Sequence, residues 1–217
     1  TQNRIAFRPT AQEIVEVMAE HGRREARPVF SFGQGCEGEP LTEIRVITDA
    51  VARFRKNGGT GTVNVNTNAS LPDAVEAFAA SGGTSIRASL SSADPDLYAA
   101  YYRPQGYAFA DVRESLARAR AAGLFISLNF LFFPGVSDTE AELAALGELI
   151  TAHRVDFVQL RNLNLDPELY LSVARSSGAL ADPARHASMG FKNFRKRLRK
   201  ACPWLRFGYF NPVVETP

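Results

Sequence analysis

The chain has 217 residues, with 25 Lys and Arg, 23 Asp and Glu, and a formal net charge of +2. Hydrophobic residues make up 45% and charged residues 22%, which is the usage of a globular domain and argues against an intrinsically disordered chain. A net charge this small argues against nucleic acid or an anionic membrane as the main partner. Two cysteines, Cys36 and Cys202, are too few for a disulfide framework or a tetrahedral metal site, and no apolar run is long enough to span a membrane. We therefore expect a cytoplasmic protein.

In chain order, short β-branched segments alternate with amphipathic segments. Strands are predicted at 28–32, 61–66, 85–90, 124–132 and 155–160, with 205–210 as a candidate last strand. Helices are predicted at 10–22, 42–56, 70–82, 109–122, 137–150, 167–176 and 188–200. Capping-type sequences at 10–13, 70–73 and 137–140 mark three of the helix starts. A longer connection follows the third strand.

Strands separated by helices at this spacing form βα units, so we expect an α/β fold with a parallel sheet. Such units either close into a barrel or remain an open doubly wound sheet, and the element pattern alone allows both. The sequence has no G-x-G-x-x-G after the first strand and no Walker A sequence. Dinucleotide and nucleotide folds of those two kinds are therefore not indicated.

The predicted strands end in polar residues. The first strand runs into 31–40, which holds three glycines, and the second runs into Asn66 and Asn68. Any one of these residues could simply solvate a loop or cap a helix. Arg87 and Arg161, however, lie within otherwise apolar strands, where a charge needs a partner or a polar cavity. Alternation along 85–90 places Arg87 and Ser89 on one face, so we expect Arg87 to point into the barrel or to meet an acid.

The inferred cavity is cationic and rich in amides, which suits a ligand with a carboxylate and hydroxyl groups. No general acid–base constellation is evident, because we expect the three histidines, His21, His153 and His186, in helices at the outer, N-terminal side of the fold. Asp166 and Glu168 follow the fifth strand and could be catalytic, but acids at the start of a helix are usually caps. If the cavity performs chemistry, we expect a cofactor to carry it.

Several segments together resemble the radical S-adenosylmethionine (radical SAM) enzymes. Residues 31–41 resemble their GGEP-type loop, 66–69 their TNG segment, and 87–94 their SLD strand. Residues 98–104 fit the loop after that strand, and 129–134 and 159–164 fit the fifth and sixth strands of the family. The resemblance covers about residues 10–175. It implies a partial (βα)6 TIM-like barrel, of which this chain supplies strands two to six, with a barrel over 1–180 and a basic C-terminal helix and tail over 181–217 packed on it.

The resemblance also implies the site residues. It assigns SAM binding to the backbone of Gly38, Glu39 and Pro40, and to Asn68, Ser89, Arg103, Asn129 and Arg161. It assigns the substrate or adenosine side of the cavity to Asn66, Arg87, Asn162 and Asn164. No residue of this chain is assigned to a metal.

The sequence departs from the family at its defining Cys-x-x-x-Cys-x-x-Cys loop, whose three thiolates hold a [4Fe–4S] cluster. Cys36 lies in the GGEP-type loop without cluster spacing, and we expect the cluster cysteines upstream of Thr1. The first hypothesis is an enzyme that reductively cleaves SAM to a 5′-deoxyadenosyl radical. It would act on a peptide or a small molecule and take its electron from a donor. The alternative is a cluster-free barrel that binds SAM or a nucleoside.

A third, weaker hypothesis concerns the basic segment 192–200, which carries six Lys and Arg residues. A solvated helix with one apolar face explains this pattern, and a docking surface for a peptide or protein is the alternative.

Overall fold

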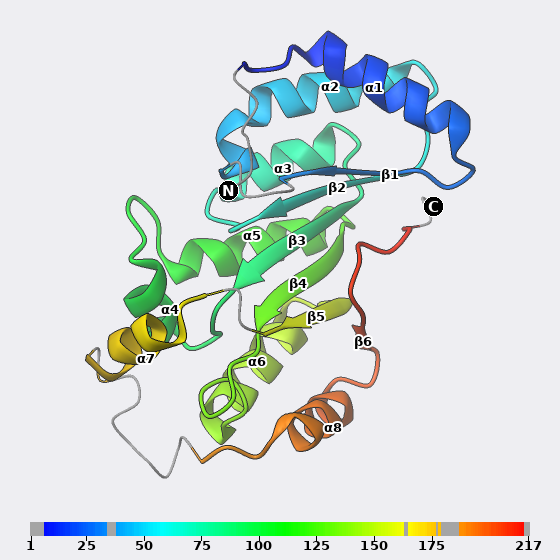
Figure 1. Ribbon diagram of the computed structural model, residues 1–217. Helices are drawn as coiled ribbons and strands as arrows, with labels where there is room; N and C mark the ends of the chain where they lie inside the picture. Colours follow the sequence, from blue (N-terminus) through cyan, green and yellow to red (C-terminus); the bar gives the residue numbers. More distant parts are fainter. Residues whose placement is uncertain (1–6, 34–37, 163–164, 177, 179–186, 215–217) are drawn as a thin grey trace. The chain divides into compact units, whose positions relative to one another are not determined.

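The computed structural model describes residues 7–33, 38–162, 165–176, 178 and 187–214 (Figure 1). The chain forms two compact units. The first comprises Thr1–Ala88, Glu114–Ile126 and Asn211–Pro217, and the second comprises Ser89–Arg113 and Ser127–Phe210. Each unit is described separately. The predicted division of the chain near residue 180 stays a prediction.

The first unit is built on parallel strands. Its elements are α1 (Ala11–Arg24), β1 (Val29–Phe32), the 3-10 helix η1 (Pro40–Glu43), α2 (Ile44–Lys56), β2 (Thr62–Thr67), α3 (Pro72–Ala80), most of β3 (Ser85–Leu90) and most of α5 (Phe109–Ala121). β1 pairs with β2 and β2 with β3, both parallel, with Val29 opposite Thr62 and Asn66 opposite Arg87. Helices α1, α2 and α3 lie on one side of β1 and β2 (Figure 1).

The second unit repeats the pattern. Its elements are α4 (Pro95–Tyr102), most of β4 (Phe125–Leu131), α6 (Glu140–Ala152), β5 (Phe157–Arg161), α7 (Pro167–Ser176), α8 (Phe191–Ala201) and β6 (Arg206–Phe207). β4 pairs with β5 and β5 with β6, again in parallel. The parallel pairing in both units confirms the predicted α/β class.

The structure corrects three local predictions. The connection after β3 contains a helix, α4, whose N-cap Asp94 accepts hydrogen bonds from the backbone of Asp96 and Leu97. Helix α6 starts at Glu140, capped by Thr139, because Ser137 is engaged with the loop after β4 instead. Ser70 does not cap α3, whose N-cap residue makes no side-chain hydrogen bond.

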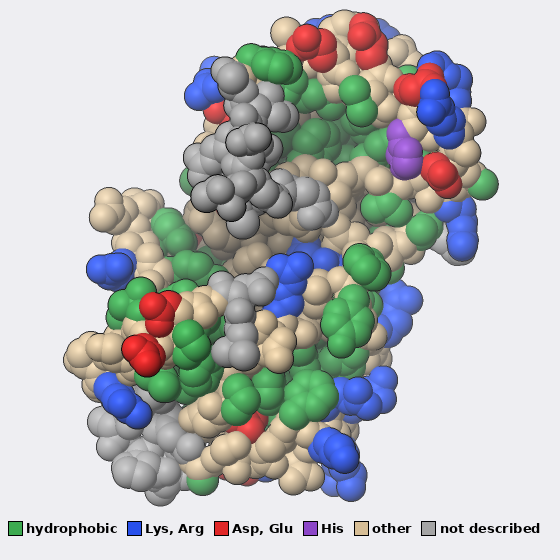
Figure 2. Space-filling model, viewed as in Figure 1, with side chains coloured by type: hydrophobic (Ala, Val, Ile, Leu, Met, Phe, Trp, Pro, Cys, Tyr) green, Lys and Arg blue, Asp and Glu red, His purple; other side chains and the backbone are tan. Residues whose placement is uncertain are grey.

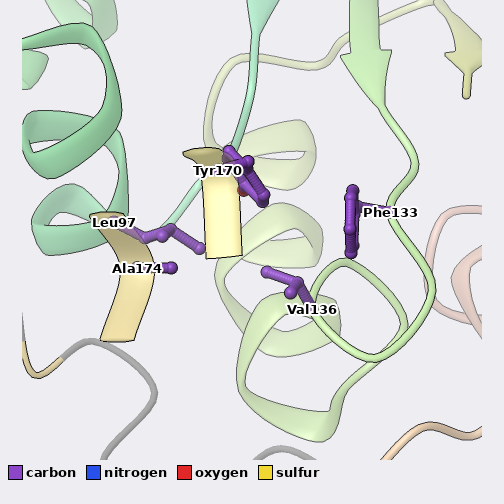
Figure 3. Packing of buried hydrophobic residues seen from close by; sticks show 5 residues of the cluster. All are labelled: Leu97, Phe133, Val136, Tyr170 and Ala174. Atoms are coloured by element: carbon purple, nitrogen blue, oxygen red, sulfur yellow. The ribbon is translucent and has the colours of Figure 1, made fainter. Parts of the chain in front are cut away.

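Packing within each unit follows the apolar spacing. In the first, the side chain of Thr10 and that of Glu13 cap α1 reciprocally, as the sequence predicts. The rings of Phe30 and Phe54 meet edge to face with centroids 5.0 Å apart. Figure 3 shows a cluster in the second unit, where Leu97 of α4 and Tyr170 of α7 lie with residues that follow β4. These residues are Leu97, Phe133, Val136, Tyr170 and Ala174.

A buried aspartate attaches the approach to α8 to the second unit. Asp138 is 1% exposed, and its carboxylate accepts hydrogen bonds from Gly135 N (2.6 Å), Ser188 Oγ (2.6 Å) and Gly190 N (2.9 Å). Three donors compensate the cost of burying this charge. The start of α8 is thereby fixed to the loop that leads from β4 to α6.

A second buried acid anchors the residues that follow β3. The Glu142 side chain in α6 accepts from Ser92 Oγ at Oε2 (2.6 Å) and from Ala93 N at Oε1 (2.5 Å). Burial raises the pKa of the Glu142 carboxyl to about 7, against the opposing effect of these two hydrogen bonds. Glu142 therefore holds a proton in the folded chain over a pH range in which an exposed glutamate is ionised.

We predict that Glu142→Gln removes the fall in stability that the titration of Glu142 causes between about pH 4.5 and pH 7. A carboxyl whose folded pKa is raised from 4.5 to about 7 stabilises the fold fully below pH 4.5 and loses that contribution as pH rises to about 7. The free energy of unfolding of the native chain should fall over this window by up to about 1.4 kcal/mol per pH unit. The amide that this substitution introduces can still accept from Ala93 N and donate to Ser92 Oγ, so the variant should fold and its curve should be flatter. Urea unfolding at several pH values measures this, with the exposed Glu168→Gln as control, and matching curves for native and Glu142→Gln chains would refute it.

Candidate functional site

A layer of hydrogen-bonded polar side chains crosses the three strands of the first unit. Asn64 of β2 is fully buried; its Nδ2 donates to Ser31 Oγ on β1 (2.9 Å), and its Oδ1 accepts from Ser85 Oγ on β3 (2.9 Å). Polar side chains at the centre of a buried sheet are costly unless satisfied in this way. The layer therefore fixes the relative positions of β1, β2 and β3.

Two residues further along each strand lies a second polar layer. Asn66 is opposite Arg87 in register, and Asn66 Nδ2 is 3.5 Å from Gly33 O. Since residues i and i+2 of a strand share a face, this layer lies on the same face as the first and nearer the carboxyl ends of the strands. Asn66 and Arg87, both assigned to the substrate side, are thus brought together.

Arg87 lies on the strand face that alternation predicts. It is 8% exposed, while its neighbours Ile86 and Ala88 are 0% exposed and point to the opposite face. A guanidinium this buried presents a positive charge next to the Asn66 amide. The predicted cavity beside this layer and the ligand role of Arg87 stay predictions.

The Glu39 carboxylate joins the GGEP-type loop to the end of β2. Oε1 accepts from Leu41 N (3.0 Å) and Thr67 Oγ1 (2.5 Å), and Oε2 accepts from Asn68 N (2.7 Å). Both oxygens are occupied by donors of the chain itself. Glu39 is therefore a positioning residue, and the SAM-binding role assigned to the backbone of the loop stays a prediction.

Gly33 and Gly38 give that loop its shape. Gly33 has φ +77°, and a Cβ there would lie 2.3 Å from Asn66 O, so only glycine allows this close approach of β1 to β2. Gly38 has φ +114° and faces open space. Gln34 to Glu37, including Cys36, lie outside the described residues. The described part of the loop exposes backbone at Gly38 and holds it through Glu39.

A pocket of about 420 Å³ lies beside this loop in the first unit. Gly33, Gly38, Glu39 and Pro40 form one wall, and residues 7–9 preceding α1 form part of another. Arg8 pairs with Glu43 at 3.0 Å across the same region. The pocket brings the segment immediately before α1 next to the GGEP-type loop.

Asn68 and Asn211 make structural hydrogen bonds that the sequence pattern does not predict. Asn68 Oδ1 accepts from Ser70 N (2.9 Å), which is a turn-forming role, and its backbone N–H is bound to Glu39. Asn211, from the C-terminal tail, donates from Nδ2 to Ser31 Oγ (3.1 Å) and so joins the first polar layer. The sequence offers no signal for Asn211, because its position depends on a contact 180 residues distant.

In the second unit, Ser89 and Asn129 are brought together. Asn129 Nδ2 is 3.5 Å from Ser89 Oγ, and Asn129 is opposite the buried Gln159 of β5. In the sequence, Gln159 is recognisable only as a polar residue near the end of the fifth predicted strand. Because it lies opposite Asn129, Gln159 joins Ser89 and Asn129 in a group of polar residues of the second unit.

The remaining predicted residues of the second unit lie at or beyond element ends. Arg161 and Asn162 are exposed at the end of β5, and Arg103 is exposed at the C-cap of α4 with φ +45°. Asn164 lies outside the described residues. Asp166 accepts from the backbone N–H groups of Glu168 and Leu169, so it caps α7. The parallel βα repeat predicts that the carboxyl ends of all five strands share one rim. This arrangement and the ligand roles of the individual residues stay predictions.

The described residues do not form a metal centre of their own. They contain no group of three or more His, Cys, Asp and Glu side chains placed to hold an ion, and Cys202, the only described cysteine, is buried. Within the described part of the chain, no helix is long and apolar enough to cross a membrane. The described backbone at residues 38–40 offers carbonyl groups that could accept from an amino group such as that of SAM, whereas the chain's two cysteines do not provide the three thiolates of a cluster.

Comparison with known proteins identifies the family. The model of the radical SAM superfamily matches residues 1–146, so the chain belongs to that superfamily. No curated protein sequence matches it significantly.

Solved structures of radical SAM enzymes share the fold. SuiB from Streptococcus suis, bound to S-adenosylmethionine, superposes with a TM-score of 0.59 at 13% identity, over 97% of this chain and 45% of SuiB. A radical SAM methyltransferase from Sphaerobacter thermophilus gives 0.52 at 19% identity, over 80% and 57%. Methylornithine synthase (PylB) gives 0.52 at 14% identity, over 97% and 67%. These neighbours confirm the TIM-barrel-like α/β fold, and the chain spans less than half of SuiB.

We predict that Glu39→Ala weakens SAM binding about tenfold or more. Its loss leaves Thr67 Oγ1, Asn68 N and Leu41 N without their acceptor, so the Gly38–Pro40 backbone is no longer held. Equilibrium dialysis with SAM measures the effect, and Glu25→Ala, an exposed acid beyond α1, is the matched control. Unchanged affinity would show that the loop keeps its conformation without the carboxylate.

For Arg87→Ala we predict a loss of SAM affinity of about tenfold that exceeds the effect on folding. This follows if the guanidinium faces a hydrated cavity and interacts with the ligand when one is bound. Affinity and melting temperature should be measured on the same preparation. Unchanged affinity with a sharply lower melting temperature would show that Arg87 is a purely structural residue. Ser89 would then be the one residue of β3 left with a predicted role in ligand binding.

Proposed function

We propose that this chain is the barrel core of a radical SAM enzyme. The observation that carries the proposal is the GGEP-type loop at Gly33–Pro40. Its backbone is held by Glu39 and adjoins a pocket that also takes in the segment preceding α1. Membership of the superfamily supports the same interpretation.

In this proposal the chain's residues bind and orient SAM. Gly38, Glu39 and Pro40 present backbone groups to the methionine amino group, and Asn68, Ser89 and Arg103 contact the carboxylate and ribose. Asn129 and Arg161 lie on the adenosine side. Asn66, Arg87, Asn162 and Asn164 face the substrate or the adenosine. Arg87 and Asn66 contribute a fixed positive charge and an amide, which orient a ligand but do not exchange protons near neutral pH.

The cofactors supply the reaction: with a [4Fe–4S] cluster bound, radical SAM enzymes reductively cleave SAM and generate a 5′-deoxyadenosyl radical. We propose that the cluster cysteines lie outside this sequence, in residues upstream of Thr1. The segment at residues 7–9 then leads from the cluster loop into α1.

For the substrate we propose a peptide or a small molecule, with a separate electron donor. One neighbour, SuiB, has been solved with its precursor peptide SuiA. Since the chain spans only part of that protein, the neighbour supports the substrate class and leaves the individual substrate open.

The full gene product tests the function directly. After anaerobic reconstitution it should contain iron and sulfide and show the visible absorption of the oxidised cluster. It should lose that absorption on reduction and release 5′-deoxyadenosine from SAM. Cys36→Ala should keep the cluster, because Cys36 lacks cluster spacing. Absence of iron and sulfide, with SAM binding retained, would favour the cluster-free SAM-binding barrel instead, and loss of the cluster in Cys36→Ala would refute our placement of the ligands.

A further inference from the structure

Positive charge is concentrated in a short part of the second unit. Residues 187–207 contain seven Lys and Arg and no Asp or Glu. Since the whole chain has a net charge of +2, removing these seven positive charges leaves −5 on the remainder. The net charge of the whole protein is therefore small although one segment is strongly basic. Figure 2 shows Lys and Arg side chains over the part of the surface where α8 lies.

Helix α8 presents nearly all of this charge to solvent. Its apolar side is used internally, because Phe194 and Leu198 are 0% exposed. Six of its exposed positions are basic: Lys192, Arg195, Lys196, Arg197, Arg199 and Lys200. Like charges at i, i+4 spacing, such as Lys192, Lys196 and Lys200, repel one another and destabilise an isolated helix.

Few of these cations are compensated. Arg197 forms an ion pair with Glu140, and the Arg199 guanidinium lies 5.4 Å from the centroid of the Phe207 ring. Among the described residues, no carboxylate pairs with Lys192, Arg195, Lys196 or Lys200. The helix therefore maintains four exposed and mutually repelling cations that have no partner of opposite charge in the described part of the chain.

A groove lies between α6 and α8, on the side of α8 that carries Arg197 and Ala201. Its volume is about 550 Å³. Leu143, Ala144, Gly147 and Ala201 line it, together with the charged residues Glu140, Glu148 and Arg197. A Cβ added at Gly147 would have no atom within 4 Å, so the groove is open at that point. Small side chains here leave room for an apolar side chain of a partner.

We propose that α8 and the α6–α8 groove form a docking surface for an acidic segment of a partner protein. Its carboxylates pair with the four uncompensated cations of α8, and one or two of its apolar side chains enter the groove. The groove favours a protein over a nucleic acid, because a phosphate backbone has no group to fill it and the net negative charge elsewhere on the chain repels a long polyanion. A membrane surface is disfavoured because the apolar face of α8 is buried.

The test uses the full chain and a fluorescein-labelled peptide of about 20 residues, in which Leu recurs at helical spacing among Glu residues. Anisotropy titrations at about 50 and 300 mM NaCl measure affinity and its salt dependence. The triple variant Lys192→Glu/Lys196→Glu/Lys200→Glu should weaken binding about tenfold or more. The matched control Arg27→Glu/Lys56→Glu/Arg175→Glu makes the same change in net charge at exposed positions elsewhere, and should have an effect below about twofold.

A second variant tests the groove separately from the charge. Gly147→Leu replaces a helical glycine at an open position, so it should fold, and its side chain should occupy the groove. We expect affinity to fall severalfold at both salt concentrations, with no change in salt dependence. The proposal is overturned if the control triple variant weakens binding as much as the α8 variant, or if the peptide shows no saturable binding. Tighter binding of a single-stranded oligonucleotide of equal charge, or of vesicles containing phosphatidylserine, would overturn it as well.

Discussion

The candidate site of the first unit depends on the carboxylate of Glu39. A loop that follows a parallel strand has few backbone partners of its own, since its N–H and C=O groups have left the sheet. By accepting from Leu41, Thr67 and Asn68 at once, Glu39 ties the loop after β1 to the end of β2. The Glu39 side chain thus fixes the conformation of the described part of the loop, which in our proposal binds SAM through its backbone.

Much of the fold could be predicted because its signals are local. The capping box at Thr10 and Glu13, the alternation around Arg87 and the glycines of the 31–40 loop each depend on residues a few positions apart. The predicted ranges of α7 and β3 agree with the structure for the same reason. Helix α4 is missed by the sequence pattern because its three aromatic residues weaken the apolar periodicity, although Asp94 and Pro95 form a proper helix start.

What the sequence does not reveal depends on long-range contacts. Asn211 reaches Ser31 from the opposite end of the chain, and Glu142 reaches Ser92 across 50 residues. Asp138 lies within the capping-type sequence at 137–140, but its carboxylate accepts from Ser188 and Gly190 at the approach to α8. For Asn211, Glu142 and Asp138 alike, the neighbouring sequence is compatible with several hydrogen-bond partners. Only the folded chain selects among them, because the cost of burying an unsatisfied group is set by tertiary packing.

Three acidic side chains of the described residues have structural roles, and this limits the groups that remain for acid–base chemistry. Glu39, Asp138 and Glu142 each accept two or three hydrogen bonds from the chain, so their carboxylates are occupied in holding loops that follow strands. The polar layers that remain consist of amides, hydroxyls and the Arg87 guanidinium. Near neutral pH these groups bind and orient, but they are poor general acids and bases. These polar layers of the described residues are therefore suited to positioning and electrostatics, which is what we expect when the reactive step belongs to a bound cofactor.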